Sequence, residues 1–213
     1  GGTSVDTFNL GHDVATVLGG SGADVFNVDA SITADLSGEA GNDQFVFVNA
    51  AALTGTLTGG TGTDTLDLSA YTTATDVTLS AAAADGYSGT ATGIASFVTI
   101  DTVAGGTATN TITGLDTTAT WTTTTTNSGD YTVGVDTLSF TDFATWQGGT
   151  GIDTFELGHN VDTVQGGTGS DVFNVNATIT AALNGEADND SFVFANGAEL
   201  TGLIDGGAGT ADS

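Results

Sequence analysis

Basic residues are missing from this chain: it has no lysine and no arginine, against 26 aspartate and glutamate residues. With its two histidines neutral, the formal net charge at pH 7 is −26. Nucleic acids and anionic membranes bind basic surfaces, so we expect neither as a partner. Because no internal cation can offset the acidic charge, solvent ions or bound metal must do so.

Cysteine, methionine and proline are also absent from the 213 residues. Disulfides therefore cannot stabilise the fold, and bound metal is the other common device in small secreted domains. No apolar run approaches the roughly 18 residues that span a bilayer, so we expect no membrane insertion. The chain opens within a repeated pattern and shows no signal peptide, and we interpret it as a fragment of a longer protein. A hydrophobic fraction of 38% and a mean hydropathy of +0.13 are sufficient for a buried core.

The chain contains a long internal repeat. Residues 1–66 align without a gap with residues 148–213, and 42 of the 66 positions are identical. We expect 1–147 to be one long repeat of about seven turns, with 67–147 less regular, and 148–213 to begin a second copy. Both would belong to one continuous structure.

A shorter repeat of nine residues lies within the long one, with two glycines at its start and an acid at its sixth position. Eight segments carry it, three of them with one substitution (Glu39, Glu186 or Asn110), and most starts are 18 to 21 residues apart. They begin at Gly1, Gly19, Gly38, Gly59, Gly105, Gly148, Gly166 and Gly185. A ninth start, at Gly206, has Ala211 in the sixth position and departs from the pattern.

Apolar residues form columns relative to these starts. The eighth position holds Phe8, Phe26, Phe45, Leu66, Ile112, Phe155, Phe173 and Phe192. The tenth position is also apolar in all but one segment, and a third column, two residues before each start, holds Val17, Leu36, Leu57, Val103, Trp146, Val164 and Leu183. Positions eight and ten of a strand face the same side. This pattern predicts stacked turns, here called rungs, that bury one another's apolar faces.

The predicted fold class is therefore all-β: a right-handed parallel β-helix, or β-solenoid of β-roll type, with rungs of about 18–23 residues. An array of β-sandwich modules is the alternative, although a sandwich does not need the same turn in every rung. We place two degenerate rungs in the middle of the chain, with turns at Asp85-Gly86 and Ser128-Gly129-Asp130. Trp121 and Trp146 are expected in the core or as a cap.

The nine-residue segment Gly-Gly-x-Gly-x-Asp-x-apolar-x resembles the glycine-rich repeat of RTX (repeats-in-toxin) proteins. The resemblance implies a β-roll loaded with Ca²⁺, within a large repetitive bacterial exoprotein or adhesin. The expected metal ligands are the sixth-position acids Asp6, Asp24, Asp43, Asp64, Asp153, Asp171 and Asp190. Calcium prefers hard carboxylate and carbonyl oxygens, and stacked carboxylates about 5 Å apart would repel one another by ~3 kcal/mol at an effective dielectric of 20.

The chain departs from the RTX pattern because only one half of each rung carries the motif. We therefore expect one row of ions, interrupted where Asn110 replaces the acid. Glu39 and Glu186 replace the second glycine of their turns and either add a ligand or point into solvent. A metal-free ladder of aspartates is the alternative to calcium, since Asx side chains also cap turns by hydrogen bonding.

No constellation of residues indicates catalysis, and we expect no enzyme activity. His12 and His159 recur at equivalent positions of the long repeat and are expected to be surface turn residues. The leading hypothesis is a secreted or cell-surface structural protein: a fibre, surface layer or adhesin stalk that self-associates end to end or laterally into filaments. Alternatives are a carbohydrate- or ice-binding adhesin module, or the secretion and folding segment of an RTX toxin.

Overall fold

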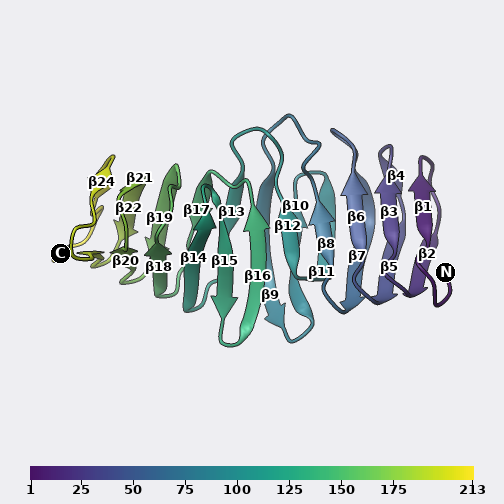
Figure 1. Ribbon diagram of the computed structural model, residues 1–213, viewed down its shortest axis with the longest axis horizontal. Helices are drawn as coiled ribbons and strands as arrows, with labels where there is room; N and C mark the ends of the chain where they lie inside the picture. Colours follow the sequence, from purple (N-terminus) through teal and green to yellow (C-terminus); the bar gives the residue numbers. More distant parts are fainter. The chain divides into compact units, whose positions relative to one another are not determined.

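The computed structural model describes all residues from 1 to 213, and it is entirely β-structure without a helix. The chain divides into two compact units, Gly1–Asn110 (unit 1) and Thr111–Ser213 (unit 2). In each unit most strands belong to two sheets, here called sheet A and sheet B, in which most strand pairs are parallel, and each regular rung adds one strand to each sheet (Figure 1). The all-β class and the parallel character predicted from the sequence are confirmed.

Sheet A of unit 1 has five parallel strands, and sheet B combines parallel and antiparallel strands. Sheet A runs in the order β1 (Thr7–Leu10), β3 (Val25–Val28), β6 (Gln44–Phe47), β8 (Thr65–Asp67) and β12 (Thr102–Ala104). Sheet B runs in the order β2 (Thr16–Ser21), β5 (Asp35–Ala40), β7 (Leu53–Thr61), β11 (Ile94–Ile100), β10 (Gly86–Ala91) and β9 (Asp76–Ala83). The short strand β4 (Ile32–Thr33) pairs with β7.

Unit 2 repeats this plan with the antiparallel strands in sheet A. Its sheet A runs in the order β16 (Asp136–Thr141), β15 (Ser128–Val133), β14 (Ala119–Thr125), β18 (Asp153–Leu157), β20 (Val172–Val175) and β23 (Ser191–Phe194). Its sheet B runs in the order β13 (Thr111–Thr113), β17 (Thr145–Gln147), β19 (Thr163–Thr168), β22 (Ala182–Ala187) and β25 (Ile204–Asp205). The short strands β21 (Ile179–Thr180) and β24 (Leu200–Thr201) pair with each other.

The core of each unit is built from the predicted apolar columns. Phe26 and Phe45 are fully buried in unit 1 and stack with ring centroids 4.7 Å apart. Phe155 and Phe173 do the same in unit 2, with centroids 4.9 Å apart. Side chains alternate in and out along these strands, as the period-2 pattern requires. Stacked aromatic rings on successive rungs therefore form the centre of the fold.

The irregular middle of the chain differs from the prediction of two degenerate parallel rungs. Strands β9, β10 and β11 form an antiparallel meander in unit 1, and β14, β15 and β16 form another in unit 2. The predicted turn positions are nearly right, because β10 begins at Gly86 and β15 begins at Ser128. Short hairpin turns there reverse the chain, and a two-stranded reversal gives antiparallel pairing.

The first meander changes which sheet the following residues enter. Val103 pairs with Leu66 in sheet A, although the sequence placed it in the column before the glycines. Ile112 pairs with Trp146, although the sequence placed it in the eighth-position column. The segment that begins at Gly105 is thus half a rung out of phase with the other seven. It follows a sheet A strand, whereas the regular segments precede one.

The meander of unit 2 contributes an aromatic cluster to the core. Trp121 and Trp146 are completely buried, which confirms their expected core position. The ring of Trp121 lies 4.4 Å from that of Tyr131 and 5.8 Å from that of Phe155, measured between centroids. The indole nitrogen of Trp146 donates a hydrogen bond to the carbonyl of Phe143. Trp121 thereby takes the place that a phenylalanine occupies in the regular rungs.

Candidate functional site: a column of buried aspartates

The sixth-position aspartates lie at the point where each glycine-rich turn enters sheet A. Because side chains alternate along an extended chain, position six faces the same side as the apolar positions eight and ten. The structure accordingly turns these carboxylates into the protein. Asp24, Asp64, Asp153 and Asp171 have no solvent exposure, and Asp43 and Asp190 are 1% exposed, so only Asp6, in the first rung, is partly open.

Hydrogen bonds join these aspartates into a ladder. In each step the backbone N–H of one aspartate donates to a carboxylate oxygen of the aspartate in the next rung, over 2.7 to 3.1 Å. The column of unit 1 is Asp6, Asp24, Asp43, Asp64 and Asp101, and that of unit 2 is Asp153, Asp171, Asp190 and Asp212. Each carboxylate thus satisfies a backbone donor that sheet pairing leaves free.

Two members of the columns were not predicted. Asp101 lies 37 residues after Asp64, because the meander of unit 1 intervenes, and it accepts the N–H of Asp64 at 2.8 Å. Asp212 follows its glycines one residue later than the motif requires, yet it accepts the N–H of Asp190 at 3.1 Å. The departure at Ala211 is therefore repaired by the next residue. The sequence signal for Asp101 was its place directly before the strand Thr102–Ala104, and that for Asp212 was its place shortly after the glycines at 206 and 207.

The second carboxylate oxygen of most column members has no hydrogen-bond partner. The buried Oδ2 atoms of Asp24, Asp43, Asp64, Asp171 and Asp190 are all in this state. A charged oxygen without a partner is costly in the interior of a protein. At neutral pH a proton, a cation or an ordered water molecule would supply the missing partner.

The first glycine of each turn makes room for this oxygen. A Cβ atom built on Gly38 would lie 2.1 Å from Oδ2 of Asp43 and 2.5 Å from the carbonyl oxygen of Gly59. A Cβ built on Gly185 would lie 2.1 Å from Oδ2 of Asp190. No side chain fits such a space, which explains the first glycine of the motif. A carboxylate oxygen and a carbonyl oxygen of the next rung converge beside it.

Burial raises the pKa of six carboxyl groups in the two columns. Desolvation is the largest cause in each case, and it raises the pKa of Asp153 to about 7 and those of Asp64 and Asp171 to about 6. The pKa values of Asp43, Asp101 and Asp190 are raised for the same reason. The backbone hydrogen bonds oppose this shift, and neighbouring carboxylates add to it. Asp64, Asp153 and Asp171 consequently change their protonation near neutral pH.

Asn110 lies outside the column, so the prediction that it takes the place of a column aspartate is wrong, although the ladder is interrupted as expected, ending at Asp101 in unit 1 and beginning at Asp153 in unit 2. The Oδ1 of Asn110 accepts hydrogen bonds from the backbone N–H and the hydroxyl of Thr75, at 2.9 and 2.8 Å. Its Nδ2 donates to the carbonyl of Gly106 at 2.7 Å. The half-rung shift caused by the meander explains this position. The column of unit 1 instead continues through Asp101.

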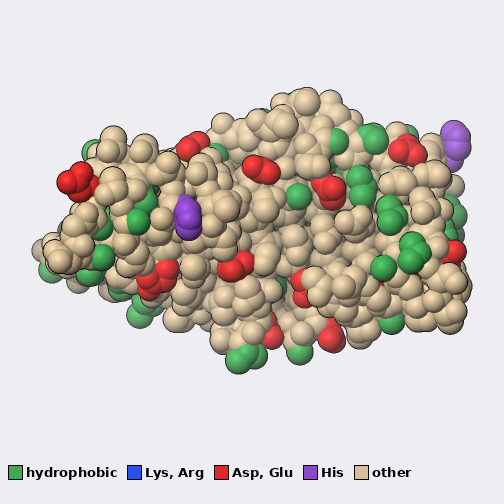
Figure 2. Space-filling view, viewed as in Figure 1, with side chains coloured by type: hydrophobic (Ala, Val, Ile, Leu, Met, Phe, Trp, Pro, Cys, Tyr) green, Lys and Arg blue, Asp and Glu red, His purple; other side chains and the backbone are tan.

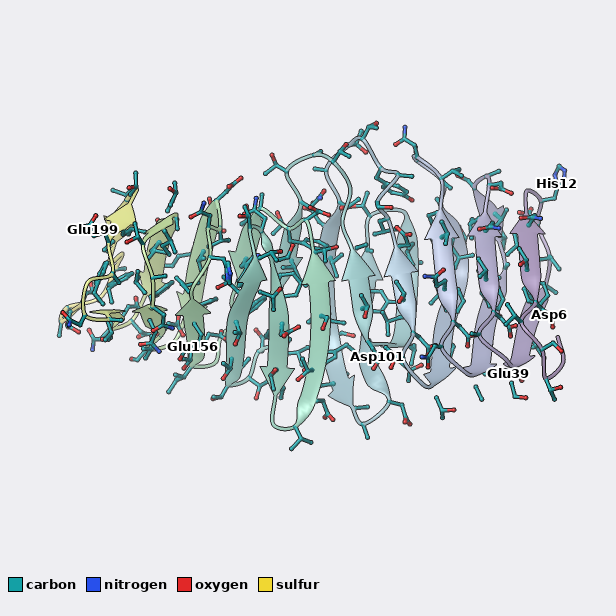
Figure 3. The ribbon with its side chains drawn as sticks, viewed as in Figure 1. Asp6, His12, Glu39, Asp101, Glu156 and Glu199 are labelled. Atoms are coloured by element: carbon teal, nitrogen blue, oxygen red, sulfur yellow. The ribbon has the colours of Figure 1, made fainter.

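The two turn glutamates differ in their surroundings. Both adopt positive φ angles where other turns have glycine, 72° for Glu39 and 74° for Glu186. Glu39 is exposed, whereas Glu186 is partly buried and accepts a hydrogen bond at 2.8 Å from the side-chain nitrogen of Gln165. Neither is part of the ladder. His12 and His159 are exposed, as expected, and Figure 3 labels His12 and Asp6 near opposite ends of β1.

Side chains that could bind a metal do not form a compact cluster. No group of three or more histidine, aspartate and glutamate side chains converges on one point. Acidic side chains are scattered on the face drawn in Figure 2, and no basic side chain accompanies them. An ion in the column would therefore take one carboxylate oxygen from each rung and the rest of its ligands from backbone carbonyls.

Each regular rung has a second turn, which leads from its sheet A strand to its sheet B strand. At this turn the two copies of the long repeat differ, with aspartate at position 13 and asparagine at position 160. Oδ1 of Asp13 accepts the N–H of Thr33 at 2.7 Å. The equivalent residue of the second copy, Asn160, accepts the N–H of Thr180 at 2.8 Å. An uncharged acceptor is thus sufficient at that turn, whereas the column keeps aspartate in both copies.

The structure contains no helix with the length and hydrophobicity needed to cross a membrane. Compared with known proteins, the chain matches no family model and no curated protein.

Proposed function

We propose that the chain is a right-handed β-solenoid that serves as a structural segment of an extracellular fibre, surface layer or adhesin stalk, stabilised by Ca²⁺ along its aspartate column. The observation that carries this proposal is the set of five buried Oδ2 atoms without a partner in a chain that has no basic residue. Regular in-register stacking of similar rungs supports the structural role. Repetition of one turn gives no single site that differs from the others.

The donor atoms of the column fit calcium chemically. Asp24, Asp43 and Asp64 would hold ions in unit 1, and Asp171 and Asp190 in unit 2, through Oδ2 and neighbouring glycine carbonyls. Calcium accepts such hard oxygens in flexible geometry. A bound ion would supply positive charge to a column whose members otherwise repel one another. The ladder of backbone-to-carboxylate hydrogen bonds already joins the rungs without it.

Thermal unfolding tests the calcium part of the proposal. The chain should melt at a higher temperature in millimolar calcium than in EGTA at pH 8, because a ligand that binds only the folded state stabilises it. Asp43→Asn should reduce this gain. Asp29→Asn is a matched control, because Asp29 is exposed and outside the column. Equal melting temperatures with calcium and with EGTA would refute the ion clamp.

Filament formation tests the structural part separately. Sedimentation velocity over a range of protein concentrations should show end-to-end or lateral association. A strictly monomeric chain at all concentrations, with and without calcium, would argue against self-association. That result would leave the calcium proposal to be decided by the melting experiment.

A second candidate function, ice binding, is favoured by one surface. Four threonines, Thr137, Thr132, Thr120 and Thr154, are paired in register across β16, β15, β14 and β18. None of these four belongs to the run of threonines at 122–126 that stands out in the sequence. Because both tryptophans are buried, the face offers hydroxyl and methyl groups and no indole ring on which a sugar could stack.

Thermal hysteresis measures this candidate directly. Wild-type protein should depress the freezing point relative to the melting point of ice, and Thr120→Lys should abolish the effect by breaking the flat line. Thr126→Lys is the control, since Thr126 is exposed and outside the line. Absence of hysteresis in the wild-type chain would eliminate the candidate.

A further inference from the structure

The turn between β23 and β24 exposes an Asn-Gly pair. The N–H of Ala198 donates to the carbonyl of Ala195 at 3.0 Å, so Asn196 and Gly197 are the two central residues of a β-turn. Both are exposed. Gly197 has a φ of 83°, and a Cβ built on it would meet no atom within 4 Å. The side-chain face of the turn is therefore open at Gly197.

The equivalent turn in the first copy of the long repeat has the same hydrogen bond but a different residue after the asparagine. Asn49 is the equivalent of Asn196, and the N–H of Ala51 donates to the carbonyl of Val48 at 3.0 Å. Ala50 stands in place of the glycine, with a φ of 61°. The Oδ1 of Asn49 accepts hydrogen bonds from the backbone N–H and the hydroxyl of Thr72, at 3.0 and 3.3 Å. Asn196 has no such partner.

A second Asn-Gly pair shows the same two residues in a strand. Asn184 and Gly185 lie within β22, where Asn184 pairs with Gln165 on one side and Asp205 on the other. Gly185 is buried. Hydrogen bonding on both sides keeps this backbone extended, and its nitrogen cannot approach the preceding side chain without local opening of the sheet.

We infer that Asn196 is a site of spontaneous covalent modification, at which the Asn196-Gly197 turn converts asparagine to aspartate or isoaspartate. The nitrogen of Gly197 bonds to Cγ of Asn196 and loses its proton, and the side-chain nitrogen leaves as ammonia. Water then opens the resulting succinimide at one of its two carbonyls. Glycine permits the approach because it has no side chain and a flexible backbone.

The modification acts on the last rungs of unit 2. Each event adds one carboxylate to a chain that has no basic residue to pair with it. The isoaspartate product also lengthens the backbone of the short connection between β23 and β24. The equivalent turn of the first copy, closed by Ala50, keeps its original charge and length, so modification makes the two copies differ covalently as the protein ages.

Peptide mapping of the aged protein tests the inference. Purified chain is incubated at pH 8 and 37 °C in ¹⁸O-labelled water and then cut before aspartates, since it has no tryptic site. The isoaspartate product should carry the label at position 196 within peptide 190–204, and the aspartate product should carry it in peptide 196–204, because the new aspartate adds a cleavage site. Asn49 and Asn184 should react at least about fivefold more slowly, the factor that corresponds to the net value of one hydrogen bond.

Two variants and one unfolded control complete the design. Gly197→Ala reproduces the turn of the first copy and should slow the reaction at position 196 at least about fivefold. In urea, Asn184 should react as fast as Asn196, because both then have the same neighbour in an open chain. Equal labelling of Asn49 and Asn196 in the folded protein, or no label at Asn196 under any condition, would overturn the inference.

Discussion

Replacing Asp171 with asparagine separates the hydrogen-bonding role of a column aspartate from its charge. Asp171 has no solvent exposure, and its Oδ1 accepts the N–H of Asp153 at 2.7 Å. Its Oδ2 has no partner. Asparagine keeps the Oδ1 acceptor and places an uncharged donor where Oδ2 stands. Asn110 shows such an arrangement, in which Nδ2 donates to a glycine carbonyl.

The expected gain follows from the pKa of Asp171. Desolvation raises this pKa from 3.8 to about 6, and a tenfold change in an acid dissociation constant corresponds to about 1.4 kcal/mol. Because the folded-state pKa lies above the unfolded-state pKa, the penalty is absent below pH 3.8, grows as the pH rises and is complete above pH 6. Without calcium at pH 8, Asp171→Asn should therefore increase the free energy of unfolding by up to about 3 kcal/mol.

Asp171→Ala is the paired variant. It removes the acceptor and leaves the buried N–H of Asp153 unsatisfied, which costs about 1–3 kcal/mol. The difference in free energy of unfolding between Asp171→Asn and Asp171→Ala should be the same at pH 4 and at pH 8, because neither variant carries a charge at this position. Urea unfolding followed by circular dichroism, in buffer freed of calcium beforehand at both pH values, measures all three proteins.

The result that would refute this reasoning is specific. If Asp171→Asn is less stable than wild type at pH 8 without calcium, the buried carboxylate is not a source of instability. If its advantage is as large at pH 4 as at pH 8, the effect does not come from ionisation. In calcium the advantage should shrink, because the wild type alone retains the full ligand set.

Three further substitutions have expected outcomes. Gly38→Ala should destabilise the protein by at least about 1–3 kcal/mol, because its Cβ would lie 2.1 Å from Oδ2 of Asp43. Gly11→Ala is the control, because a Cβ at Gly11 meets nothing within 4 Å. Equal urea midpoints for the two variants would contradict the steric explanation. Trp121→Ala should cost about 3–5 kcal/mol by emptying a buried site, and a melting temperature like that of wild type would be inconsistent with its burial. Glu39→Gly should stabilise the fold by about 1 kcal/mol by relieving a positive φ, measurable by urea unfolding, whereas a loss would mean that the glutamate side chain contributes more than its backbone costs.

The regular rungs were predictable from the sequence because period-2 alternation and a fixed turn repeat together in each of them. These two signals were sufficient to predict that the eighth-position residues, such as Phe8 and Phe155, stack on one another. The same alternation also implied that the aspartates face inward, since position six has the parity of position eight. We had interpreted the aspartates only as turn residues and therefore did not predict that they are buried.

The meanders were not predictable by the same means. Residues 81–84 are all alanine and residues 122–126 are all threonine, so neither segment shows an alternation of apolar and polar side chains that would indicate its pairing direction. The phase of the residues after the first meander depends on how many strands the chain adds before it returns. For this reason Val103, Ile112 and Asn110 were assigned to the wrong places, and Asp101 was overlooked.

The steps of the aspartate ladder have very unequal lengths in sequence. In unit 1 the chain covers 18, 19, 21 and 37 residues between successive members, and in unit 2 it covers 18, 19 and 22. Spatially each step is the same backbone-to-carboxylate hydrogen bond. A gene of this kind can therefore gain codons between two ladder aspartates, up to a whole pair of strands, while the rungs on either side of the insertion stay in register.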